Sequence, residues 1–228
     1  MSRALSSHPV SAPALDLRAK RHFLFDLDGT LVDSSAAHER AYRDALAGHS
    51  RELAAAFGYE ATKGKRTVEV FRELGLGEPE LLARLVRKKQ EAYLAHVARG
   101  DVELFPGARA LLDRLVATGR GCFLATGASR RSTDQVLARC GVTGLFTDTV
   151  TADDVQHGKP SGDCFELLVR RWQLTPADCL VVEDAENGVA AARAAGLHVA
   201  VVHSPAVRSG DVSFTSLERL SEAMEDRA

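Results

Sequence analysis

Two carboxylates separated by one residue follow a short apolar segment near the start of the chain. Asp26 and Asp28 come directly after residues 23–25 and are followed by Gly29. An apolar run of this length, bounded by turn residues, is typical of a strand buried on both faces. Successive strand side chains point to opposite sides, so Asp26 and Asp28 are expected on the same side. Two carboxylates this close repel each other unless a cation lies between them, and a hard divalent ion such as Mg²⁺ meets this need.

Two further stretches carry groups that bind phosphate. Thr126 and Gly127 follow the apolar residues 121–125. A hydroxyl beside free backbone N–H groups, where a strand meets a helix, is a phosphate-binding arrangement. Lys159 stands in a Gly-Lys-Pro turn, and its ammonium can neutralise a phosphoryl group or the carboxylate that carries it. Taken singly, the first stretch is equally typical of a helix cap, and the second of a solvated loop lysine.

A second pair of acids, Glu183 and Asp184, follows four consecutive apolar residues. Acids in this position are costly to bury unless a cation or hydrogen bonds satisfy them. Mg²⁺ prefers an octahedral shell of oxygens from one or two carboxylates, water and substrate phosphate. We therefore expect Asp26, Asp184 and the main-chain carbonyl of Asp28 to bind Mg²⁺.

These four stretches resemble, in order, the four motifs of the haloacid dehalogenase-like hydrolases. An Asp-x-Asp-Gly-Thr segment stands first, a strand-end threonine second, Gly-Lys-Pro third, and Glu-Asp before an alanine-rich segment fourth. The resemblance covers about residues 23–196. Because each stretch lies at a predicted strand end or turn, the context supports the motifs. The alternative for the first motif is a simple acidic turn in a hairpin. The occurrence of all four motifs in the family order argues against it.

The resemblance also implies a role for each motif residue. Asp26 would be a nucleophile that forms an aspartyl-phosphate, and Asp28 the general acid/base. Thr126 would bind the phosphoryl group. Asp184 would bind the metal, with Glu183 in the outer shell of that metal.

The segments that position these residues alternate between strand and helix patterns. Apolar strands are predicted at residues 23–25, 121–126, 146–150, 179–182 and 198–202. Strands that alternate with helices of about 10–15 residues predict βαβ units and a parallel sheet. Right-handed crossovers bring the carboxyl ends of such strands to one edge, where ligands bind. We therefore predict an α/β fold with a Rossmann-like core formed by residues 22–34 and 103–228.

The stretch between the two parts of this core, residues 35–102, shows helical spacing and predicts a small inserted helical cap. Its place directly after the first strand lets it close over the strand ends and exclude water. It is similar to the cap of the β-phosphoglucomutase-like branch, which implies that His38, Arg66 and Lys89 face the substrate. A basic turn also offers Lys65 or Arg66 to an anionic or polyhydroxylated substrate, although such charge runs are usually solvated.

Composition excludes several other classes of protein. The 228 residues include 29 basic and 31 acidic ones, so the net charge of −2 gives no reason to expect binding to nucleic acid or a membrane surface. No apolar run approaches the ~20 residues of a spanning helix. Four cysteines without a Cys-x-x-Cys pair argue against a zinc cluster or disulfide framework, which favours a cytoplasmic protein. Residues 1–21 are expected to form a flexible leader, with a targeting segment as the alternative.

The expected function is a Mg²⁺-dependent phosphatase acting on a small phosphate ester, such as a sugar or polyol phosphate. A phosphomutase is the first alternative; mutases of this branch tend to carry a bulky aliphatic residue where this chain has Thr30, which favours hydrolysis. Residues 129–131, Ser-Arg-Arg, stand where the mutase has a lysine, which argues against a phosphoglucose substrate. A dehalogenase would need neither Asp28 nor Asp184. The third alternative is a non-catalytic binding module on the same fold.

Overall fold

A six-stranded parallel sheet, in the order β5-β4-β1-β6-β7-β8, forms the centre of the computed structural model, which describes residues 15–63 and 65–225. Its strands are β1 (His22–Phe25), β4 (Gly121–Ala125), β5 (Asp148–Val150), β6 (Cys179–Glu183), β7 (His198–Val202) and β8 (Val212–Phe214). Because every pair is parallel, the strands end at one edge of the sheet. The predicted α/β fold with a parallel sheet is confirmed.

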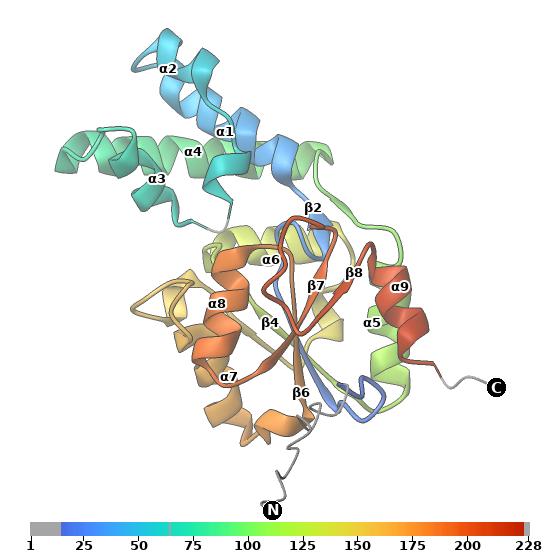
Figure 1. The fold of residues 1–228 in the computed structure, drawn as a ribbon. Helices are drawn as coiled ribbons and strands as arrows, with labels where there is room; N and C mark the ends of the chain where they lie inside the picture. Colours follow the sequence, from blue (N-terminus) through green and yellow to red (C-terminus); the bar gives the residue numbers. More distant parts are fainter. Residues whose placement is uncertain (1–14, 64, 226–228) are drawn as a thin grey trace, which may run out of the picture.

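Helices cover both faces of this sheet, as Figure 1 shows. Alternation along β1 sends Phe23 and Phe25 into one apolar cluster and Leu24 into another, so the strand is buried on both sides. The first cluster is closed by α5 (Ala108–Ala117), α6 (Arg130–Arg139) and α9 (Leu217–Ala223). The second is closed by α7 (Asp163–Trp172) and α8 (Glu186–Ala194). The double covering fixes the strand ends from which the polar residues project.

Residues 35–102, the helical cap, contain α1 (Ser35–Ala47), α2 (Arg51–Ala56), α3 (Thr67–Glu73) and α4 (Pro79–Arg99). Figure 1 shows these helices grouped together beyond one end of the sheet. They enclose an apolar cluster of their own that includes Tyr42, Phe71 and Leu85. A short antiparallel ribbon of β2 (Val32–Asp33) and β3 (Glu103–Leu104) carries the chain into and out of the cap. The helical spacing of the sequence agrees with this arrangement, while the division into two domains stays a prediction.

Short elements account for most differences from the sequence pattern. The two-residue strands β2 and β3 and the three-residue strand β8 are not predicted, because so few residues carry no readable alternation. Four single turns of 3₁₀ helix complete the described structure: η1 (Glu60–Thr62), η2 (Thr143–Leu145), η3 (Ala152–Asp154) and η4 (Pro176–Asp178).

The end of the expected leader packs against the core. Leu17 and Lys20 are buried, and the Lys20 ammonium donates to the carbonyl oxygen of Ala177 at 2.5 Å. Residues 1–14 of that leader lie outside the described residues. All four cysteines are free thiols. None of the described helices combines the length and apolarity needed to cross a membrane.

Candidate active site

A cavity of about 400 Å³ lies between the helical cap and the carboxyl ends of β1, β4 and β6. Every candidate residue named from the sequence lines it: Asp26, Asp28, His38, Lys65, Arg66, Lys89, Thr126, Gly127, Lys159, Glu183 and Asp184. These residues come from both sides of the cavity, with the acids on the sheet and most of the cations on the cap. Clefts of this volume are the usual size for a small metabolite.

Three buried carboxylates meet at the sheet side of the cavity. One oxygen from each of Asp26, Glu183 and Asp184 lies within 4.8 Å of the others. Burial raises the pKa of Asp26, that of Glu183 to about 8 and that of Asp184 to about 7. Ionised acids this close are strongly unfavourable unless cations balance them. The donor set, all hard oxygens, fits a divalent cation such as Mg²⁺.

Lys159 is the cation that already balances part of this charge. Its buried ammonium donates to Asp26 Oδ1 at 2.6 Å, to Glu183 Oε1, and to the carbonyl oxygen of Ala125 at 2.9 Å. Burial alone would lower the pKa of Lys159, but the carboxylates of Asp26 and Glu183 outweigh it and raise that pKa. All three of its N–H donors are therefore used, and the side chain stays charged.

Asp28 belongs to a separate chain of hydrogen bonds that leads into the cap. The Lys89 ammonium lies 2.9 Å from His38 Nδ1, and His38 Nε2 lies 3.2 Å from Asp28 Oδ1. Because an ammonium only donates, His38 Nδ1 must accept the hydrogen bond from Lys89. The ring proton is therefore on Nε2, which donates a hydrogen bond to Asp28. Burial and the charge of Lys89 lower the pKa of His38, which keeps the ring neutral. Tyr93 donates to the same carboxylate oxygen at 3.1 Å.

These contacts hold Asp28 ionised. Burial works to raise the pKa of Asp28, but the contacts with His38 outweigh it and hold that pKa well below its usual range. Burial lowers the pKa of Lys89 to about 8, so its ammonium still predominates at neutral pH. His38 and Lys89, expected from the sequence to face the substrate, thus contact each other and Asp28.

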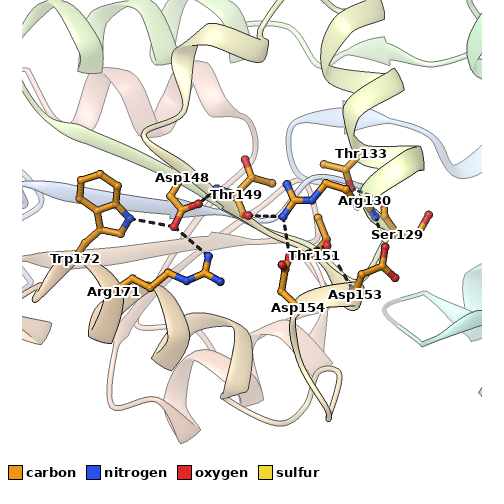
Figure 2. A network of polar contacts seen from close by, with 10 residues as sticks. All are labelled: Ser129, Arg130, Thr133, Asp148, Thr149, Thr151, Asp153, Asp154, Arg171 and Trp172. Carbon is orange, nitrogen blue, oxygen red and sulfur yellow. Dashed lines mark hydrogen bonds and ion pairs between the residues drawn. The ribbon is translucent and has the colours of Figure 1, made fainter.

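The turn after β4 is held in place by a network around Arg130 (Figure 2). The backbone N–H of Arg130 donates to Asp153 at 2.8 Å, and its guanidinium donates to Asp154 at 2.7 Å. Both acids lie in η3, directly beyond β5. The network joins the ends of two neighbouring strands. It fixes the turn that carries the buried Thr126 and the exposed Gly127 at the cavity wall.

A family model of the haloacid dehalogenase-like hydrolases matches residues 20–196, which include all four polar stretches. The chain belongs to this family. This hydrolase is 32% identical over 201 residues to CbbY of Rhodobacter capsulatus, across 83% of this chain and 88% of that protein. It is 35% identical over 210 residues to hexitol phosphatase A of Escherichia coli, across 87% and 92% of the two chains.

Solved structures agree with the fold. CbbY from Rhodobacter sphaeroides, crystallised with phosphate, superposes with a TM-score of 0.76 at 25% identity, across 88% of this chain and 96% of that one. The family, the fold class and the enzyme class, a phosphatase of this family, are therefore as predicted.

In this hydrolase, the cations in the basic turn of the cap already have partners within the protein. Lys65 forms an ion pair with Glu73 at 2.7 Å, which neutralises it. The Arg66 guanidinium donates to the carbonyl oxygen of Gln156 in the core at 3.3 Å. Arg66 therefore joins cap to core at the rim of the cavity. Gly64, between these cations and Lys63, lies outside the described residues.

Two glycines leave the space that the carboxyl groups of Asp184 and Glu183 occupy. Gly29 has a φ of +89°, and a Cβ there would lie 2.3 Å from Asp184 Oδ2. A Cβ on Gly188, in the first turn of α8, would lie 1.9 Å from the Glu183 carboxyl. The sequence shows the spacing of these glycines but not which side chains lie against them.

We expect Gly188→Ala to destabilise the protein by about 1–3 kcal/mol, because the added methyl must displace the buried Glu183 carboxyl. Alanine is otherwise the better helix residue, so a loss cannot come from helix propensity. The check is the free energy of unfolding in urea. The matched control is Gly58→Ala, at an exposed site where a Cβ meets nothing within 4 Å, with an expected change within about 0.5 kcal/mol. Equal stability of Gly188→Ala and wild type would contradict this packing.

Proposed function

We propose that this hydrolase is a Mg²⁺-dependent phosphatase that cleaves a small sugar or polyol phosphate through an aspartyl-phosphate on Asp26. The observation that carries the proposal is the meeting of Asp26, Glu183 and Asp184 with Lys159 at one end of the cavity. The relationship to hexitol phosphatase A supports the substrate class. The cavity volume of about 400 Å³ suits a small phosphate ester.

Asp26 is the proposed nucleophile because it stands at the end of β1 with one oxygen held by Lys159. This contact fixes the carboxylate and opposes the effect of burial on its pKa, so the anionic form is available for attack on phosphorus. The Thr126 hydroxyl, which accepts a hydrogen bond from the Ala128 N–H, is proposed to donate to a phosphoryl oxygen. Lys159 is proposed to contribute its positive charge beside the phosphoryl group. Asp26, Asp184 and the carbonyl of Asp28 would hold Mg²⁺, which when bound supplies positive charge for the transferring phosphoryl group.

Asp28, two residues further on, is the proposed general acid/base. Because Asp28 is ionised before substrate binds, it would first take up the proton of the phosphate ester monoanion and pass it to the leaving oxygen. It would later accept a proton from the water that attacks the aspartyl-phosphate. His38 and Lys89 are proposed as positioning residues, because their hydrogen bonds orient this carboxylate and control its charge. Glu183 is proposed to act through Lys159, which it contacts directly.

The test is release of inorganic phosphate from a panel of sugar, polyol and nucleotide monophosphates, with Mg²⁺ and with a chelator. We expect release from sugar or polyol phosphates that the chelator abolishes and added Mg²⁺ restores. Release that needs no metal would contradict the proposed site. Turnover that appears only with a bisphosphate activator would show a phosphomutase instead.

A further inference from the structure

Tyr59 is a cavity residue whose hydroxyl has no hydrogen-bond partner among the residues that the structure describes. The three tyrosines of the chain, Tyr42, Tyr59 and Tyr93, all line the cavity. The Tyr42 hydroxyl donates to Thr67 at 3.4 Å and the Tyr93 hydroxyl to Asp28 at 3.1 Å. Within residues 15–63 and 65–225, the Tyr59 hydroxyl makes no hydrogen bond. A hydroxyl left open in a binding cavity is available to a ligand.

The backbone and ring of Tyr59 are nevertheless held firmly. Its N–H donates to Glu39 at 3.3 Å, and its carbonyl oxygen accepts from the Thr62 hydroxyl at 2.7 Å. Its ring stacks on that of His38, with 5.1 Å between centroids and 21° between planes. A group fixed in this way loses little freedom when it binds a ligand.

The surroundings of Tyr59 indicate which part of a substrate it meets. Burial raises the pKa of Tyr59 well above its usual value, and the nearby charges of Asp28 and Asp184 raise it further. The phenol is therefore a neutral hydrogen-bond donor near these acids. It brings no positive charge to a phosphate group. The proposed phosphoryl contacts, Lys159 and Thr126, lie on the core side. Tyr59 lies on the cap side and stacks on His38, whose ring contacts Asp28. Since Asp28 is the proposed acid for the leaving oxygen, Tyr59 would lie on the side of the leaving group.

We propose that Tyr59 selects the leaving group by hydrogen bonding to a hydroxyl on the carbon next to the ester carbon. The enzyme would then prefer phosphate esters of vicinal hydroxy compounds over esters that lack this hydroxyl. The inference rests on the proposed function and names the feature of the substrate that the cavity recognises. A site with a partner for a substrate hydroxyl discriminates against the analogue without it, because the protein group is then left unpaired.

The test compares two small esters: glycerol phosphate esterified at a terminal carbon, and its analogue without the middle hydroxyl. We expect wild type to prefer glycerol phosphate about tenfold in kcat/KM. Tyr59→Phe should lower kcat/KM for glycerol phosphate by that factor and leave the analogue within about twofold. The matched control, Tyr42→Phe, removes the same atom from a tyrosine already bonded to Thr67 and should keep the wild-type preference.

Three outcomes would contradict the role of Tyr59, and they distinguish its failure from a failure of the proposed phosphatase function. An equal loss on both esters in Tyr59→Phe would overturn the inference, because Tyr59 would then act on the shared phosphoryl group or on the fold. A wild type that hydrolyses the wider panel without preferring glycerol phosphate would overturn it as well and leave the proposed function standing. No phosphate release from any ester would contradict the proposed function, and with it this inference.

Discussion

Asp26→Asn is expected to abolish turnover, with kcat lower by at least about 10⁴-fold, while the protein remains folded. The amide keeps the shape of the carboxylate but removes the nucleophilic oxygen that would bond to phosphorus. The Lys159 ammonium keeps two of its three partners, Glu183 and the carbonyl of Ala125. The measurements are steady-state phosphate release and urea unfolding of the variant beside wild type.

A matched control separates the loss of the nucleophile from the loss of one charge. Asp134→Asn makes the same chemical change at an exposed position on α6, away from the cavity lining. Its turnover should equal that of wild type. Measurable steady-state hydrolysis by Asp26→Asn would contradict the mechanism, whatever its effect on stability.

The second large effect is expected from Lys159→Met. The methionine side chain is similar in length but leaves Asp26 and Glu183 buried without their cation, because the salt bridges to both are lost. Breaking a buried pair in this way costs about 3–5 kcal/mol of unfolding free energy. Phosphate release should also fall by at least about 10²-fold, since a charge that faces the phosphoryl group is removed.

The measurement is urea unfolding at neutral pH, in chelator and in Mg²⁺. The loss of stability should be smaller in Mg²⁺, because an ion that binds the carboxylates of the folded protein shifts the equilibrium toward the folded state. Lys88→Met, at an exposed position of α4, is the control and should change stability by no more than about 0.5 kcal/mol. A Lys159→Met protein as stable as wild type would show that this lysine does not balance the acids.

The core of the site was predictable because simple rules govern it. Asp26 and Thr126 directly follow an apolar strand, and Glu183 is the last residue of another. Parallel strands with right-handed crossovers bring such ends together. Their meeting at one cavity follows from the strand pattern without knowledge of any side-chain contact. The short strand β8 carries too little alternation to be recognised, so the sheet is one strand wider than predicted.

Contacts across the cap were beyond reach of the same rules. Lys89 meets His38 because α4 packs against α1, and helical spacing gives the buried face of each helix but not its partner. Tyr93 recurs at core spacing on α4, so its hydrogen bond to Asp28 has no signal in the sequence. The ion pair of Lys65 with Glu73 likewise depends on how a turn folds back on α3. These contacts decide which cations of the cap are free.

The most direct test of the aspartyl-phosphate is to quench the enzyme in acid during turnover of its best substrate and to analyse its peptides by mass spectrometry. We predict the added mass of one phosphoryl group on the peptide that contains Asp26, and its absence from Asp26→Asn treated in the same way. Wild-type peptides without added mass under turnover, or the same added mass in Asp26→Asn, would contradict a phosphoryl intermediate on Asp26.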